Sequence, residues 1–339
     1  ETRDPRPETR PLGLIVNPAS GKDIRRLVAH ASVFDNREKG NILRRVILGA
    51  VAAGATSFLY VADAHGVTEG ALDGLKVEAR FEPVQIPHTD SALDTIHAAE
   101  RLREAGCGVV VTLGGDGTNR AVALGWQDAP LVPISTGTNN VFPQMIEGTV
   151  AGAAAGLVAT GTVRLEDVAT QAKTIQVQIE GERDDLALID AALLEGAFAG
   201  SRAIWDSTAL RLVVLARAEP AAVGLSAVGG LLDPVGAGDD CGLCLTFGGR
   251  ERLVRAPLAP GLYQDLPIRT ARRLALSEVC TVEGPGILAF DGERERRLRP
   301  GQRAVLTVRR DGPRVVNVER ALAEAAWLGV FQKDRPGDR

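Results

Sequence analysis

The stretch VVVTLGGDGTNRAVALG, residues 109–125, runs from an apolar segment through a glycine-rich loop into a second, helix-like segment. Gly114, Gly115 and Gly117 allow backbone amide groups to approach an anion closely, because glycine has no side chain to keep the anion away. The N-terminus of the following helix adds free amide donors and the positive end of the helix dipole. The stretch therefore predicts a strand, a phosphate-binding loop and a helix in succession.

Two other loops have the same construction. One has the sequence NPASGK (residues 17–22) and follows an apolar run at 12–16; the other, STGTNN (135–140), follows a run at 131–134. Their hydroxyl groups can donate hydrogen bonds to phosphate oxygens, and Lys22 adds a positive charge. Three such loops at one edge of a sheet predict a site for a phosphate-rich ligand, formed by Asn17, Ser20, Gly21, Lys22, Gly114, Gly115, Gly117, Thr118, Thr136, Gly137, Thr138, Asn139 and Asn140.

The residues from 12 to about 161 alternate between short apolar runs and longer helix-like segments. The runs predict strands at 12–16, 58–62, 84–86, 108–113 and 131–134. The segments between and after them predict helices at 23–53, 90–105, 119–126 and 142–159. Apolar strands that alternate with helices are typical of a parallel sheet covered on both faces, which binds ligands at the carboxyl ends of its strands.

Beyond residue 164 the pattern changes to short strand-like runs separated by turns rich in Gly, Asp and Pro. The runs lie at 175–179, 187–189, 210–215, 243–247, 274–276, 287–290 and 304–308, and they predict a mostly β domain, either a sandwich or an open barrel. We expect a disordered leader at 1–11, an α/β nucleotide-binding domain at 12–162 and a β-sandwich domain at 163–317. A C-terminal helix and tail at 318–339 should return to the first domain.

The composition of the 339-residue chain excludes several classes of protein. Its 43 acidic and 39 basic side chains give a net charge of −4, which provides no general attraction to nucleic acid or to an anionic membrane. Aromatic residues make up only 4%, too few for base-stacking surfaces. No apolar run reaches the roughly 18 residues of a membrane span. We therefore expect a cytoplasmic protein that holds an anionic ligand at a local site.

Asp116 is the carboxylate inside the central loop, where it would repel a phosphate unless it had another task. It could accept a proton from an attacking hydroxyl group, or help to hold Mg²⁺ that bridges the phosphates. The structural alternative is an Asx turn, in which Asp116 binds its own backbone. Because glycines flank it and two companion loops lie nearby, we assign Asp116 a catalytic role.

Two common nucleotide-binding signatures do not fit these loops. A Walker A loop would need glycine where Val16 stands, and serine or threonine where Asp23 stands. A dinucleotide fingerprint would need glycine in place of Arg120. The ligand is therefore held by a different arrangement.

The GGDGT sequence at residues 114–118 resembles the hallmark of the NAD kinase and diacylglycerol/sphingosine kinase superfamily, and the NPASG sequence at 17–21 is similar to its NPxSG motif. Residues 133–143, 147–155 and 200–206 most resemble the acetoin-catabolism protein X group of NAD-kinase-like proteins. The resemblance implies a phosphofructokinase-like α/β domain followed by a β-sandwich. It also implies ATP and Mg²⁺ as cofactors, Asp116 as the base, and an acceptor hydroxyl that could belong to NAD. Related kinases form dimers or tetramers, so a homo-oligomer is expected.

The sequence also departs from the NAD kinase pattern, which leaves the acceptor open. The TGSTAY string and the Asn-Glu pair that binds the NAD ribose and adenine are absent; by order along the chain, the nearest candidates for that pair are Asp190 and Glu195. Asp291-Gly292-Glu293 resembles the DGE motif of the lipid kinases, although a hairpin turn is its default interpretation. Arg202 could face the ligand or form a surface salt bridge. A lipid or polyol kinase and a non-catalytic nucleotide-binding protein therefore remain alternatives.

Overall fold

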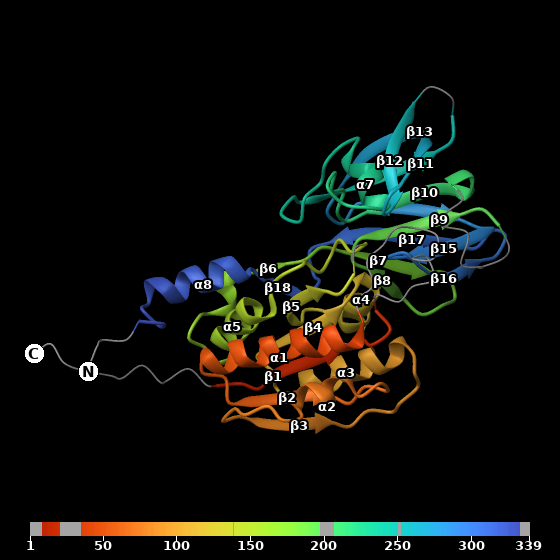
Figure 1. Ribbon diagram of the computed structural model, residues 1–339. Helices are drawn as coiled ribbons and strands as arrows, with labels where there is room; N and C mark the ends of the chain where they lie inside the picture. Colours follow the sequence, from red (N-terminus) through yellow and green to blue (C-terminus); the bar gives the residue numbers. More distant parts are fainter. Residues whose placement is uncertain (1–8, 21–34, 138, 197–206, 250–251, 333–339) are drawn as a thin grey trace, which may run out of the picture.

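The first domain is built on a parallel sheet in the computed structural model, which describes residues 9–20, 35–137, 139–196, 207–249 and 252–332 (Figure 1). Five parallel strands lie in the order β3-β2-β1-β4-β5. Their bounds are β1 Leu12–Val16, β2 Ser57–Val61, β3 Arg80–Val84, β4 Val109–Gly114 and β5 Pro130–Ser135. All three predicted ligand loops therefore follow neighbouring strands, β1, β4 and β5, at one edge of the sheet.

Helices cover both faces of this sheet, because successive apolar side chains of each strand point to opposite faces. Leu14 and Val111 belong to the core under α1, α5 and α8, whereas Ile15 and Val110 belong to the core under α3 and α4. The helices are α1 Asn36–Ala52, α2 Val67–Leu72, α3 Ala92–Glu104, α4 Asp116–Gly125, α5 Gly148–Ala159, α6 Leu165–Val168 and α8 Val318–Trp327.

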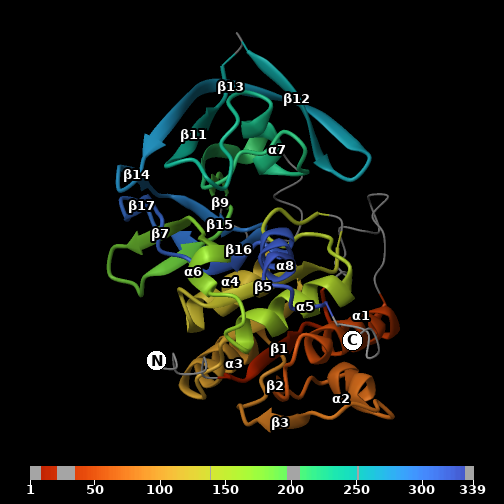
Figure 2. The same ribbon diagram turned by 90° about the vertical axis from the view of Figure 1, so that its left-hand side faces the viewer.

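The second domain consists of two antiparallel sheets with an apolar core between them (Figure 2). The larger sheet has the order β12-β13-β11-β10-β9-β15-β16 and the smaller one β14-β17-β7-β8. The outer face of the larger sheet carries a further core under α7 and the β12–β13 hairpin. The bounds are β7 Thr174–Ile179, β8 Asp185–Ala187, β9 Asp190–Leu194, η3 Ser207–Ala209, β10 Leu210–Leu215, α7 Leu225–Gly230, β11 Cys241–Phe247, β12 Leu253–Ala259, β13 Leu262–Ala275, β14 Val279–Glu283, β15 Gly286–Phe290, β16 Glu293–Leu298 and β17 Arg303–Arg309.

The predicted fold class, an α/β domain followed by a mostly antiparallel β domain, is confirmed, but the expected boundary near residue 163 does not follow the sheets. Two short strands beyond that boundary, β6 Ala169–Gln171 and β18 Arg314–Val316, extend the first sheet, with β18 paired in parallel to β5. The exposed edge of β5 needs hydrogen-bond partners, and strands of three residues carry too little pattern to be recognised in the sequence.

The chain crosses between the domains twice, and the two crossings are bonded to each other. The Ala172 amide donates to the Pro313 carbonyl oxygen at 2.8 Å, and the Gly312 amide donates to the Ala172 carbonyl oxygen at 3.0 Å. The second domain is therefore joined to the edge of the first sheet by a two-stranded connection. Within the part of the chain that the structure describes, none of the helices has the length and apolar character to cross a membrane.

Several predicted elements begin or end elsewhere in the structure. The helix expected from residue 142 begins at Gly148, because the amide of Phe142 instead donates to the Asp116 side chain. The helix expected from residue 119 begins three residues earlier, at Asp116. The strand expected at 84–86 is β3, at 80–84, and the run expected at 187–189 starts at the last residue of β8 and leads to β9.

Helices α1 and α5 cross at van der Waals contact through glycines. A Cβ atom on Gly152 would fall on the carbonyl oxygen of Val46, and one on Gly49 would fall on the carbonyl oxygen of Thr149. The glycines of the GTVAGAAAGLVA helix therefore allow the two backbones to touch, which brings α1 against the sheet behind the first loop.

We expect Gly152→Ala to lower the free energy of unfolding by about 3 kcal/mol, because neither backbone can move away without unpacking the helix pair. Gly70→Ala in α2 is the matched control, since a Cβ there meets no atom within 4 Å. This control should raise the free energy of unfolding by up to about 1 kcal/mol through helix propensity. Urea denaturation of both variants measures the difference, and equal stabilities would contradict the packing argument.

Candidate active site

A cavity of about 880 Å³ lies between the two domains. On the side of the first domain, the cavity is lined by the loops at the carboxyl ends of β1, β2, β3, β4 and β5. On the side of the second domain, it is lined by β9, β10, α7, the β12–β13 turn and the β15–β16 turn. The predicted loops therefore open into one cavity, as expected for ligand binding at the ends of parallel strands.

The first loop is held in shape from behind by a buried lysine. Lys39, in α1, has no exposed surface, and its ammonium group donates to the carbonyl oxygens of Asn17, Pro18 and Ser20 at 3.0, 2.8 and 2.6 Å. Because these carbonyl groups point back toward Lys39, the loop is fixed in one conformation. In addition, the Asn17 carboxamide oxygen accepts from the amides of Ala19 and Ser20 at 2.9 and 3.2 Å.

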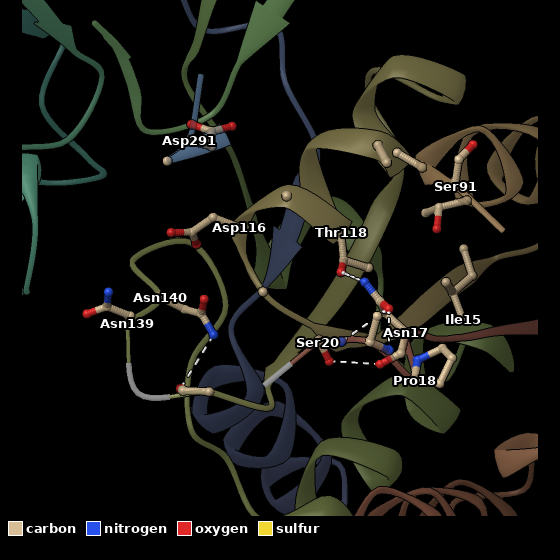
Figure 3. Close-up of a pocket in the computed structure, with 18 of the residues that line it drawn as sticks. Ile15, Asn17, Pro18, Ser20, Ser91, Asp116, Thr118, Asn139, Asn140 and Asp291 are labelled. Atoms are coloured by element: carbon tan, nitrogen blue, oxygen red, sulfur yellow. Dashed lines mark hydrogen bonds between the residues drawn. The ribbon is translucent and has the colours of Figure 1, made fainter. Parts of the chain in front are cut away.

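Side-chain and backbone hydrogen bonds connect the three loops, and Figure 3 shows the bond between Asn17 and Thr118. The Asn17 carboxamide donates to the Thr118 hydroxyl at 2.9 Å, which joins the first loop to the second. The Ser20 and Thr136 hydroxyl groups lie 2.6 Å apart, which joins the first loop to the third. The amide of Thr136 donates to the carbonyl oxygen of Gly114 at 3.1 Å, which joins the third to the second. The three loops thus form one rigid surface.

Asp116 is the first residue of α4 and lines the cavity. Its carboxylate accepts from the Val141 amide at 3.1 Å and from the Phe142 amide at 2.8 Å, so its direction is fixed by the loop after β5. Burial raises the pKa of Asp116 to about 7, and the carboxylate of Asp291 adds to this rise. The two amide bonds and the guanidinium of Arg217 oppose it.

Asp291 lies across the cavity from Asp116, in the second domain (Figure 3). It occupies the turn between β15 and β16, where Asp291 and Gly292 have φ values of 48° and 79°, typical of a tight hairpin turn, as the sequence predicted. Its carboxylate accepts from the amides of Leu188, Ile189 and Asp190, with a shortest distance of 2.7 Å. Burial raises the pKa of Asp291, although these bonds and Arg120 oppose the rise.

Two arginines cross the domain boundary in opposite directions. Arg120, in the first domain, lies 5.2 Å from the centre of the Phe290 ring, and Arg217, in the second, lies 5.1 Å from the centre of the Phe142 ring. Phe290 precedes Asp291, and the amide of Phe142 binds Asp116. Each arginine therefore brings positive charge to the carboxylate of the other domain. Arg120 acts on Asp291, and Arg217 acts on Asp116.

The structure brings most of the predicted site residues together, and it separates a few from the ligand space. The cavity is lined by Asn17, Ser20, Gly115, Asp116, Gly117, Thr118, Gly137, Asn139, Asn140, Asp190 and Asp291. Gly114 and Thr136 do not line the cavity and serve the contacts between loops instead. Glu195 is exposed and does not line it either. Gly21, Lys22, Thr138 and Arg202 lie outside the described residues.

Sequence reasoning missed several residues that form this site. Lys39 lies in a helix-like segment among several charged residues, and nothing in the local pattern marks its side chain as buried. Arg217 is the one charged residue in the apolar run from Val213 to Ala218. A charged side chain in such a buried run indicates that it has a partner. The loops after β2 and β3, with Asp63, His65 and His88, and Asp94 in the first turn of α3 extend the cavity beyond the three glycine-rich loops.

The side chains of the site that could bind a cation do so through oxygen atoms, mainly those of carboxylates. Among the described residues, no group of three His, Cys, Asp or Glu side chains could hold a metal ion by itself. The arrangement can bind an anion through loop amides and hydroxyl groups, and it can accept a proton at a carboxylate near neutral pH.

Comparisons with known proteins divide the chain in a similar way. The family model of the ATP-NAD kinase N-terminal domain matches residues 12–163, and the model of the acetoin catabolism protein X C-terminal domain matches residues 173–311. Acetoin catabolism protein X from Cupriavidus necator is 33% identical over 332 residues, which cover 93% of this chain and 92% of that protein.

Solved structures resemble the fold across nearly the whole chain. Yeast NADH kinase complexed with NADH has a TM-score of 0.55 at 13% identity, covering 98% of this chain and 91% of that one. A diacylglycerol kinase from Bacillus anthracis has a TM-score of 0.46 at 13% identity, covering 89% of this chain and 97% of that one. The likeness to the yeast enzyme shows an NAD kinase-like fold.

The role of Lys39 can be tested by replacing its ammonium group. We expect Lys39→Met to lower the free energy of unfolding by about 1–3 kcal/mol, because three carbonyl oxygens lose a charged donor. Lys76→Met, at an exposed lysine, should change the stability by less than about 0.5 kcal/mol. Guanidinium denaturation of both variants checks this expectation, which fails if the two changes are equal.

Proposed function

The chain belongs to the acetoin catabolism protein X family, and we propose that it is a kinase that transfers a phosphate group from ATP to the hydroxyl group of a small acceptor in the interdomain cleft. The observation that carries the proposal is Asp116, a carboxylate with a raised pKa at the junction of three anion-binding loops and the second domain. Its NAD kinase-like fold is consistent with this chemistry.

The three joined loops would bind the phosphates of ATP. Gly115, Gly117 and Gly137 line the cavity without side chains, and α4 directs the free amides of its first turn toward the same space. The Thr118 hydroxyl already accepts a bond from Asn17, so its own proton is available to a phosphate oxygen. Because the loops are bonded to one another, little order would have to be gained when the nucleotide binds.

Asp116 would act as the general base. It would take the proton of the acceptor hydroxyl, whose oxygen then forms a bond to the γ-phosphorus while the bond to the bridging oxygen of ADP breaks. A base with a pKa near the working pH combines a sizeable ionised fraction with a strong drive to accept a proton. Burial and Asp291 provide that pKa, since an ordinary aspartate would be a much weaker base.

The residues of the cleft fit Mg²⁺, which binds oxygen ligands and is usually held by one or two carboxylates together with phosphates. One oxygen of Asp291, Oδ2, accepts a single amide bond, from Leu188, and retains a lone pair for a metal ion. Asp291 would hold the ion, and the phosphates of ATP would supply most of the remaining ligands. Bound there, Mg²⁺ would neutralise phosphate charge beside the two carboxylates.

NAD is the first acceptor to test, because the ATP-NAD kinase domain model matches the first domain. The proposal itself requires only a hydroxyl group that can reach Asp116. A nucleotide that binds tightly but is never turned over with any acceptor would instead indicate a non-catalytic nucleotide-binding protein.

Asp116→Asn removes the base but keeps the shape of the side chain. We expect the turnover rate to fall by about 10²–10⁴-fold, with ATP binding and the melting temperature nearly unchanged. Asp128→Asn, at an exposed carboxylate outside the cavity, is the control and should keep full activity. Transfer of labelled phosphate from ATP measures the rate, and an active Asp116→Asn enzyme would eliminate this mechanism.

The raised pKa of Asp116 gives a definite pH dependence. Because the base must be ionised, kcat/KM should rise about tenfold per pH unit below pH 7 and level off above it. In Asp291→Asn the neighbouring negative charge is lost, so the pKa of Asp116 should fall and the midpoint should move to lower pH. Rate profiles from pH 5 to 9 test this shift, and an unchanged midpoint would refute the coupling.

A further inference from the structure

The part of the cavity that lies against the second domain has an apolar wall. Leu194 and Leu210 come from β9 and β10, and Leu258 comes from the end of β12. Leu225 is the first residue of α7, and Val223 lies in the segment before it. Ala192, Pro260 and Ala289 complete this apolar wall. It is continuous with the core on the outer face of the larger sheet, so the strands of that sheet hold it in place.

The hydroxyl group of Ser226, which also lines this region, is already engaged. It donates to the carbonyl oxygen of Arg217 at 3.0 Å and accepts from the amide of Glu219 at 3.1 Å. Val223, Leu258 and Pro260 are the partly exposed members of the apolar wall, so they present hydrocarbon to a ligand. Apolar surface that a ligand covers there contributes favourably to binding.

Carboxylates mark the boundary between the apolar wall and the phosphate-binding loops. Asp116, Asp190 and Asp291 all line the cavity, and two of them come from the second domain. An acceptor with its own phosphate or carboxylate group would meet these like charges in a partly buried space, where repulsion is strong. A cationic acceptor would place its charge beside Asp291, where the proposed Mg²⁺ ion would be held, and the two cations would repel each other.

We propose that the acceptor is an uncharged alcohol with an apolar body of several carbon atoms, whose hydrocarbon part packs on the apolar wall while its hydroxyl group reaches Asp116. This inference rests on the proposed kinase function and specifies its substrate class. NAD, which carries two phosphate charges, should therefore bind there more weakly than such an alcohol.

The binding step can be tested without catalysis. Uncharged 1,2-diols from propane-1,2-diol to octane-1,2-diol would be titrated into the 339-residue protein with Mg²⁺ and a non-hydrolysable ATP analogue, next to NAD, glycerol 3-phosphate and choline. The affinity of the diols should increase about fourfold for each added methylene group until the apolar wall is covered. NAD, glycerol 3-phosphate and choline should bind more weakly than the best diol.

Two variants localise that binding to the apolar wall. Leu258→Ala and Val223→Ala, at half-buried positions on different elements, should each weaken diol binding by about tenfold and leave binding of the ATP analogue unchanged. Leu253→Ala, on the same strand as Leu258 but exposed and outside the cavity, is the matched control and should bind like the parent. Melting temperatures verify that each variant is folded.

The outcomes separate the two proposals. Tighter binding of NAD or of another charged acceptor than of every diol, or no difference between Leu258→Ala and Leu253→Ala, would overturn the assignment of substrate class. Transfer of labelled phosphate from ATP is measured with the same compounds. Diols that bind as described but are never phosphorylated would overturn the kinase function while keeping the apolar wall as a ligand site.

Discussion

The cleft depends on a pair of opposed negative charges that the two domains hold close to each other. Asp116 and Asp291 are each fixed by backbone amides, so neither can turn away from the other. Their repulsion is offset by Arg120 and Arg217, which stack on Phe290 and Phe142 across the boundary. A buried charge is tolerated only with such partners. The same two arginines therefore contact the opposite domain and influence the pKa values of Asp116 and Asp291.

One buried ion pair, between Arg120 and Asp185, crosses this boundary. Arg120 also binds Asp185 at 2.7 Å and the Leu186 carbonyl oxygen at 2.6 Å, and Arg296 approaches Asp185 from the other side at 3.3 Å. The arginine that rules out a dinucleotide fingerprint in the sequence is thus the residue that fastens α4 to the second domain. The helix that carries Asp116 cannot shift without breaking these bonds.

The sequence alone predicted the alternating first domain, the β-rich second domain and the convergence of three loops, because each depends on a local pattern. The sequence did not distinguish the residues that line the cavity from the residues that hold the loops in place. Thr136 has the right hydroxyl group in the right loop, yet it is buried against Ser20. Lys39 and Arg217 act on segments more than 15 residues away along the chain, and such contacts leave no periodic signal.

The two-stranded connection at residues 169–174 and 309–316 limits how the cleft can move. A single linker would let one domain swivel freely, whereas two crossings that are hydrogen-bonded to each other resist torsion and leave bending as the easy deformation. The domains would then open by bending about these two crossings, and each closure would return Asp291 to the same position relative to Asp116. Any proton transfer in the cleft would then begin from the same placement of the two carboxylates.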